Sequence, residues 1–207
     1  MFKDRTDAGE RLAELVRSEE VTTDIVLAIP RGGLPVGRPV ADALDVPLDV
    51  VVAKKLGAPG NPELAIGAVG ADGSVWLNDA LIERVGATDA YVERERQRKA
   101  EEASVKATQY RGTGSIPDLD GKRVVVVDDG VATGATTVAC IRQVKNAGAS
   151  HIILAVPVGS PSSIERLHSE ADEVICIEAP PHFGAVGQFY RVFGQVPDEV
   201  ARTYLRE

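Results

Sequence analysis

The densest set of residues that could do chemistry lies at residues 124–137 (VVVVDDGVATGATT). Four valines end in the acidic pair Asp128 and Asp129, and small and hydroxylated residues follow. Ligands of open α/β sheets lie beyond the carboxyl ends of the strands, and a helix N-terminus presents free backbone N–H groups to an anion. Carboxylates beside such a cradle would repel a bare phosphate, whereas they suit sugar hydroxyls and a hydrated Mg²⁺ ion. The segment therefore predicts a site for a phosphorylated ribose and magnesium.

The predicted phosphate cradle is the turn that leads into the next helix. Its glycine permits close approach of a phosphate, and its threonines can add hydroxyl donors. The cradle consists of Ala132, Thr133, Gly134, Ala135, Thr136 and Thr137. In the plainer interpretation the acidic pair only caps the helix, but a cap needs one acid and leaves the Thr/Gly run unexplained. The segment lacks the G-K-[ST] ending of a Walker A loop.

A second anion site is predicted at residues 28–37 (AIPRGGLPVG), where another strand runs into a loop and a helix. Arg31 offers fork-shaped donors, and Gly32 and Gly33 let the backbone turn its N–H groups toward an anion. The alternative is a glycine turn with a surface arginine. The spacing of these glycines does not fit the dinucleotide fingerprint G-x-G-x-x-G.

Two lysines, Lys54 and Lys55, follow the apolar run of the second strand. Because side chains alternate along a strand, only one of them should project over the same sheet edge, and Lys55 is favoured. Two solvated lysines are the alternative.

Aromatic residues gather at residues 180–196 (PPHFGAVGQFYRVFGQV), which hold three of the four phenylalanines. Such a segment could form a stacking slot for a planar base, or it could be a small local core that ties down the tail. The candidate base-binding residues are Phe183, Val186, Gly187 and Tyr190.

Short Val- and Ile-rich runs alternate with helical patterns, which is typical of a parallel α/β sheet. Strands are predicted at residues 24–30, 47–54, 122–128, 151–158 and 173–177, and helices at residues 34–44, 134–147, 161–169 and 197–206. A first helix should open with a capping box at Asp7 and Glu10. We therefore predict a doubly wound parallel sheet that places the acidic pair and its loop at the carboxyl edge.

The middle of the chain has a different pattern. Residues 56–61 read as a turn-rich loop, and residues 64–70 and 74–77 read as a hairpin. Residues 88–110 form a predicted charged helix without a wide apolar stripe. Its basic residues could close over a ligand, but interleaved glutamates favour a solvated face.

The length, apolar content and net charge of the chain limit the number of domains and the kinds of partner that we expect. The chain has 207 residues, is 44% apolar and carries a net charge of −8, which predicts a single domain over residues 1–207 and disfavours nucleic acid as a partner. We expect neither a signal peptide nor a membrane span, so the predicted location is the cytoplasm. Cys140 and Cys176 are expected to be buried thiols.

The segment at residues 124–137 resembles the PRPP motif of type I phosphoribosyltransferases, where PRPP is 5-phosphoribosyl 1-pyrophosphate. The resemblance implies a Mg²⁺-dependent transfer of the phosphoribosyl group from PRPP to a small nitrogen acceptor, a nucleobase by preference, with release of pyrophosphate. It also implies that residues 31–33 and a lysine hold pyrophosphate, that residues 56–80 and 180–196 build a small hood, and that a homodimer is compatible with the family. Hypoxanthine-type enzymes have an aspartate where this chain has Ala132, so a base-protonating role of the loop is in doubt.

Two rival functions remain open at this stage. One is a non-catalytic PRPP- or nucleotide-binding regulatory module. The other is a sugar-phosphate hydrolase on a similar sheet, although no Ser/His/Asp or Cys/His set recommends itself in the sequence.

Overall fold

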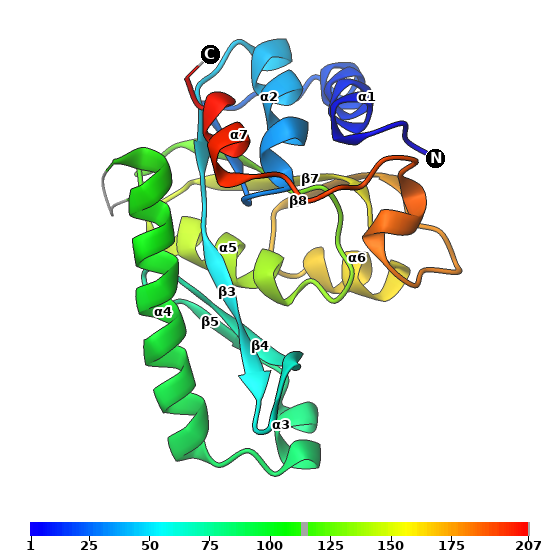
Figure 1. Ribbon diagram of the computed structural model, residues 1–207. Coiled ribbons are helices and arrows are strands. Elements are labelled where there is room, and N and C mark those ends of the chain that lie inside the picture. Colours follow the sequence, from blue (N-terminus) through cyan, green and yellow to red (C-terminus); the bar gives the residue numbers. More distant parts are fainter. Residues whose placement is uncertain (113–115, 207) are drawn as a thin grey trace.

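The computed structural model describes residues 1–112 and 116–206, and these residues form two sheets (Figure 1). Five parallel strands lie in the order β2-β1-β6-β7-β8, and three antiparallel strands lie in the order β3-β4-β5. The parallel part contains α1 (Arg5–Ser18), β1 (Ile25–Ala28), α2 (Gly33–Leu44), β2 (Leu48–Val50), β6 (Arg123–Val127), α5 (Ala135–Asn146), β7 (His151–Val158), α6 (Pro161–Leu167), β8 (Glu173–Glu178) and α7 (Asp198–Thr203).

The parallel sheet is doubly wound, as predicted. Its central strand, β6, consists largely of valines that are fully buried, because helices cover both faces of the sheet. Val125 and Val127 point into the core shared with α1 and α2, whereas Val124 and Val126 point into the core shared with α5. In Figure 1, α1 and α2 lie above this sheet and α5 and α6 lie below it.

The antiparallel sheet forms a separate unit on the far side of α5 (Figure 1). It contains β3 (Ala53–Ala58), β4 (Asn61–Gly70) and β5 (Val75–Leu77), and it is followed by α3 (Asp79–Val85) and α4 (Asp89–Arg111). Val92 of α4 packs into the core of the small sheet, while Ala103 and Ala107 pack into the core of the parallel sheet. The long helix therefore braces the small sheet against the large one. Its described residues also form ion pairs with one another, three at i,i+3 and one at i,i+4.

The prediction of one strand over residues 47–54 is wrong. Strand β2 ends at Val50, and the chain changes sheets before β3 begins at Ala53. Val51 and Val52 remain buried through the change, so the apolar run continues although the strand does not. The residues predicted as a loop at 56–61 belong instead to the β3–β4 hairpin, in which Ala58 pairs with Asn61.

Three further predictions concern the second hairpin, the start of the first helix and the two cysteines, and some of them are wrong in detail. The hairpin at residues 64–77 is present as β4 and β5. The first helix is capped by Asp4, whose side chain accepts a hydrogen bond from Asp7 N, so the predicted capping box begins three residues too late. Cys140 is buried, whereas Cys176 is only half-buried; both thiols are free.

The tail runs back along the molecule to the beginning of the chain. A short 3-10 helix, η1 (Val186–Phe189), follows β8, and Phe2 N donates to the Phe189 carbonyl (2.7 Å) while Arg191 N donates to the Phe2 carbonyl (2.9 Å). The two segments assigned to a hood, residues 56–80 and 180–196, lie in different parts of the molecule (Figure 1).

Candidate functional site

The loop between β6 and α5 lies at the carboxyl edge of the parallel sheet, where such sheets bind their ligands. It is held in place by the neighbouring strand, because Val131 N donates to the Val158 carbonyl (2.9 Å) and Ser160 N donates to the Val131 carbonyl (2.8 Å). Gly130 has a φ of +157°, and a Cβ there would lie 2.6 Å from a methyl carbon of Val186. Only glycine fits this approach of the tail to the loop.

The N-terminus of α5 is open, as an anion site requires. Gly134 is the N-cap with a φ of +72°, and no side chain caps the helix among the described residues. The first helical hydrogen bond runs from Val138 N to the Gly134 carbonyl (2.9 Å). The preceding N–H groups are thus left for a ligand, and the helix dipole favours a negative charge on it.

A cavity of about 160 Å³ opens in front of these N–H groups. It brings together every residue of the predicted cradle, one of the two acids, one of the two lysines and one residue of the tail. Its lining consists of Lys55, Asp128, Gly130, Val131, Ala132, Thr133, Gly134, Ala135, Thr136, Thr137 and Val186.

A larger cleft of about 470 Å³ shares Lys55 and Thr136 with this cavity. It extends past Pro30 toward the face of α4, where Lys99 and Glu102 line it. Because the two spaces share these residues, a single ligand could place a phosphate in the cavity and further charged groups in the cleft.

The acidic pair is divided between two environments. Asp128 lines the cavity, and its burial together with the neighbouring charge of Asp129 raises its pKa well above the usual value. Asp129 is instead paired with Arg5, whose Nε donates to Asp129 Oδ2 (2.7 Å). Asp128 is therefore the carboxylate that faces the cavity, while the charge of Asp129 is already compensated by an arginine.

The β1–α2 loop packs against the same strand end. A Cβ on Gly32 would lie 1.9 Å from Asp129 Oδ2, and one on Gly33 would lie 2.8 Å from the Val127 carbonyl oxygen. These glycines are thus required by close packing, and Gly33 N already donates to the Ile29 carbonyl (3.0 Å). The Pro30–Arg31 peptide bond is cis, and the Arg31 side chain forms no hydrogen bond or ion pair with the described residues.

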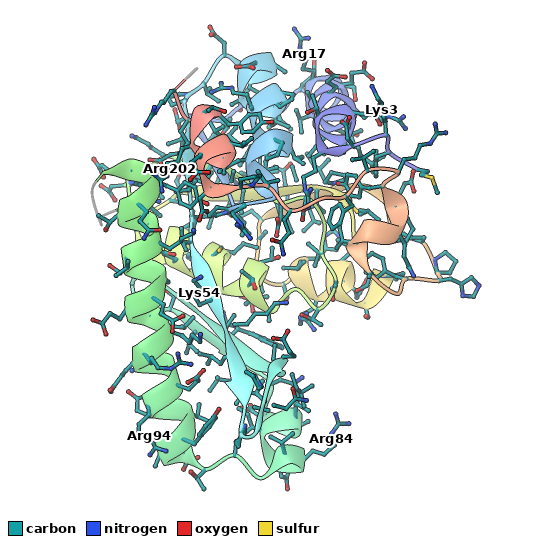
Figure 2. The ribbon with its side chains drawn as sticks, in the orientation of Figure 1. Lys3, Arg17, Lys54, Arg84, Arg94 and Arg202 are labelled. Carbon is teal, nitrogen blue, oxygen red and sulfur yellow. The ribbon has the colours of Figure 1, made fainter. Side chains whose placement is uncertain are left out.

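The two lysines differ in position. Both lie on β3 of the small sheet and not at the end of a parallel strand, which corrects the predicted location. Lys55 reaches the cavity of the phosphate loop. Lys54 lies beside α4 (Figure 2), where burial and the charge of Lys106 lower its pKa. Both lysines line the larger cleft, and of the two only Lys55 also lines the cavity.

The four tail residues assigned to a base hood differ in how far they are buried, and two of them are packed inside the tail. Tyr190 is 5% exposed and packs between the rings of Phe2 and Phe193, so its ring lies in a local core and offers no free face to a base. Its hydroxyl donates to the Asp129 carbonyl (2.6 Å). Gly187 packs under Phe193.

The remaining two hood residues are more accessible. Phe183 is half-buried and stacks on Phe189, with ring centres 5.2 Å apart. Val186 is the tail residue that reaches the cavity. Only these two of the four candidates stay available to an acceptor.

Sequence reasoning missed the residues that hold the site from outside. Arg5 joins Asp129 to the tail, because its Nη1 also donates to the Gly194 carbonyl (2.7 Å) and its guanidinium lies 3.9 Å from the centre of the Phe193 ring. Ser163 and Arg166 of α6 donate to carbonyls of the phosphate loop. These residues lie in ordinary helix patterns, and no local signal marks them.

The described residues contain no cluster of three or more acidic, histidine or cysteine side chains that could hold a metal by itself. The Asp128 carboxylate, which faces the cavity, is nevertheless suitable for Mg²⁺, because this ion keeps several waters and binds through one or two carboxylates together with phosphate oxygens of a substrate. Within the same part of the chain, no helix has both the length and the apolar character needed to cross a membrane.

Comparison with protein families matches residues 3–193 to the family described as phosphoribosyl transferase domain. A Mycobacterium tuberculosis (strain H37Rv) protein named "Putative phosphoribosyl transferase Rv0571c" is 41% identical over 206 residues, which cover 99% of this chain and 46% of that protein. This chain thus spans about half the length of the curated relatives that it matches.

Solved structures show the same similarity. The crystal structure of TT1426 from Thermus thermophilus is 41% identical in sequence and has a TM-score of 0.81, with 99% of this chain and 97% of that chain covered. The AQ2163 protein from Aquifex aeolicus shares the fold at 12% identity, with a TM-score of 0.53 over 97% of this chain and 85% of that chain.

Proposed function

Since the chain belongs to the phosphoribosyl transferase domain family, we propose that it transfers the 5-phosphoribosyl group of PRPP to a nitrogen acceptor and releases pyrophosphate. One observation carries the proposal. The open N-terminus of α5, the cavity-facing carboxylate of Asp128 and the Nζ-bearing side chain of Lys55 surround one space at the edge of the parallel sheet. These groups are complementary to a phosphate, a sugar hydroxyl and a second anionic group of one molecule.

The reaction breaks the bond between ribose C1 and the pyrophosphate oxygen, whose electron pair leaves with pyrophosphate. A lone pair of the acceptor nitrogen forms the new bond to C1, and that nitrogen then loses its proton. The contribution of the protein is to position both reactants and to compensate charge. The loop at residues 132–137 would anchor the 5-phosphate, and Asp128 would accept hydrogen bonds from the ribose hydroxyls.

The leaving pyrophosphate needs cationic partners. Lys55 stands at the junction of the cavity and the larger cleft, and Arg31 follows Pro30, which lines the cleft. Both cations are suited to pyrophosphate. Lys54 lines the larger cleft but not the cavity, so it would add positive charge in the cleft alone. Mg²⁺ held beside Asp128 and Asp129 would supply further positive charge for pyrophosphate.

We expect the acceptor to be a nucleobase or a comparable planar amine. The loop carries Ala132 and no acid at that position, so the acceptor must lose its proton without help from a carboxylate there. Val186 lines the cavity and Phe183 keeps part of its ring exposed, whereas Tyr190 is buried in the local core. We therefore expect Val186 and Phe183, of the four candidates, to contact such a ring.

An assay of pyrophosphate release tests the proposal. The protein is incubated with PRPP, MgCl₂ and a panel of nucleobases and amines, and pyrophosphate is measured against a reaction without acceptor. Acceptor-dependent release supports the transferase. Calorimetric binding of PRPP without release by any acceptor would favour the regulatory binding module instead, and absence of both would refute the assignment.

Two adjacent lysines provide a matched pair for the same assay. Lys55→Met should weaken pyrophosphate binding by about tenfold, since a hydrogen bond to a charged group is lost. Lys54→Met removes an equal charge one residue away and should change the affinity much less. Equal losses in both variants would mean that only the summed charge of β3 matters, and that Lys55 is not a specific ligand.

A further inference from the structure

Three side chains at and after the end of β7 donate hydrogen bonds to carbonyl groups of the phosphate loop, on the side away from the cavity. Ser160 Oγ and Ser163 Oγ both donate to the Ala132 carbonyl (2.7 and 2.6 Å). Arg166 Nη2 donates to the Thr133 carbonyl. Ser160 is the N-cap of α6, and Ser163 and Arg166 follow it at spacings of three, so the three side chains lie on the same side.

These hydrogen bonds fix the orientation of the loop peptides. A peptide carbonyl and the N–H group of the same peptide point in opposite directions. When the carbonyls of Ala132 and Thr133 are held toward α6, the N–H groups of the following residues are turned away from α6, toward the cavity that the loop lines. The hydrogen bonds from α6 thus set the orientation in which the loop presents its N–H groups to the cavity.

Arg166 differs from Arg5, Arg111 and Arg142, each of which pairs with a carboxylate. Among residues 1–112 and 116–206, Arg166 has no carboxylate partner, and its buried Nε lacks a hydrogen-bond partner. Its contacts within the described residues are a neutral carbonyl and a neutral ring, so no direct ion pair there neutralises its positive charge.

The neutral ring is that of Trp76, on β5 of the small sheet. The guanidinium carbon of Arg166 lies 5.0 Å from the ring centre, within range of a cation–π interaction. Trp76 also packs against a small cluster that includes Ala135 and Ala139 of α5. The indole therefore touches both the arginine and the helix that begins at the cradle.

Resting on the proposed function, we infer that Arg166 is a positioning residue for the 5-phosphate. It aligns the loop through the Thr133 carbonyl, and it places an uncompensated positive charge behind the cradle. Trp76 holds the guanidinium in this orientation. The small sheet thereby contributes to phosphate binding through Trp76, in addition to its contribution of Lys55 to the cavity.

Calorimetry with ribose 5-phosphate and with inorganic pyrophosphate tests this role. Arg166→Gln should weaken ribose 5-phosphate by about tenfold or more and leave pyrophosphate within about twofold, the change expected of a site not touched directly. Arg166→Lys keeps the charge without the planar fork, so its affinity for ribose 5-phosphate should lie between those of the parent and Arg166→Gln. Trp76→Leu should shift affinity in the same direction by a smaller factor.

Arg142→Gln is the matched control. Arg142 also ties β5 to a helix, because it donates to the Val75 carbonyl (2.8 Å) and pairs with Glu170, but it does not touch the loop. This variant should lose thermal stability and keep the affinity for ribose 5-phosphate. Unchanged ribose 5-phosphate affinity in Arg166→Gln, or equal losses for both probes, would overturn the role of Arg166. A parent protein that binds neither probe would overturn the proposed function and this role together.

Discussion

The phosphate loop and the C-terminal tail meet at Asp129 but are built in opposite ways. The loop works with backbone groups of consecutive residues, and its helix N-terminus is left open. The tail is instead held by contacts between aromatic side chains, and one of these contacts is to the other end of the chain, where Phe2 packs against Tyr190. The loop is held through its carbonyl groups by α6, while the N–H groups at the start of α5 have no side-chain cap in the described part of the chain. Much of the aromatic surface of the tail is instead covered by packing against other aromatic rings.

Asp129 shows how the two regions are joined. Its carboxylate is held by Arg5, its carbonyl accepts from the Tyr190 hydroxyl, and Arg5 in turn lies on the Phe193 ring. The acidic pair of the motif is thus half ligand site and half anchor for the tail. This division implies that the two acids are not equivalent, although they are adjacent in sequence.

The largest effect should follow from emptying the tail core. Phe2 is fully buried, and Phe2→Ala should lower the free energy of unfolding by about 3–5 kcal/mol, as other buried phenylalanines do. Urea denaturation measures the change, with Val192→Ala as a control because Val192 belongs to the same tail and is exposed. A loss under about 1 kcal/mol, typical of surface sites, would show that the tail is not packed as a core.

The second effect concerns the joint between the regions. Asp129→Ala leaves the largely buried Arg5 without its carboxylate, so it should destabilise the fold by about 1–3 kcal/mol. Asp128→Ala removes the cavity-facing acid without breaking an ion pair, and it should reduce ribose 5-phosphate affinity more than stability. Calorimetry and thermal melting of both variants measure the contrast. Identical behaviour of the two variants would contradict the division of the acidic pair.

Residues that are close in sequence made the loop and the parallel sheet predictable. The acidic pair, the cradle and the buried valines of β6 all follow one another, so their types and order indicated strand, turn and helix. Side chains alternate along a strand in either kind of sheet, so the sequence indicates that Lys54 and Lys55 point in different directions.

The missed features depend on contacts between distant residues. Arg5 and Asp129 are 124 residues apart, and Arg166 and Thr133 are 33 apart. The change of sheets after Val50 was hidden because Val51 and Val52 stay buried between the two sheets. The burial of Tyr190 required Phe2 as a neighbour, and nothing in residues 180–196 indicates where the N-terminus lies.

Alanine substitutions at two glycines test how much the backbone of the phosphate loop contributes to ribose 5-phosphate affinity. Gly134 and Gly86 have nearly equal positive φ angles, +72° and +67°. Alanine at Gly86 should cost about 1–2 kcal/mol of stability because L-residues disfavour this conformation, and a Cβ there would meet no atom within 4 Å. Alanine at Gly134 should cost more, because its Cβ would also lie 2.9 Å from Arg166 Nη2. Only Gly134→Ala should also weaken ribose 5-phosphate, since Gly86 caps α3 away from the site. Equal phosphate affinity in both variants would show that the cradle tolerates a side chain.

The smallest effect tests what remains of the base hood. Phe183 is half-buried and stacks on Phe189, so a planar acceptor could extend this stack and gain about 0.5–1.5 kcal/mol from ring geometry. Phe183→Ala should then raise the KM for the acceptor by roughly two- to tenfold, while PRPP affinity stays unchanged because the phosphate and diol contacts lie on the loop. Phe183→Leu is the useful companion, because it retains apolar contact with Phe189 and loses the aromatic face. If the ring acts on the acceptor, the leucine variant should keep the melting temperature and still show the raised KM. If both variants instead melt earlier and keep the parental KM, Phe183 belongs to the packed tail together with Tyr190, and the acceptor must be bound by other residues around Val186.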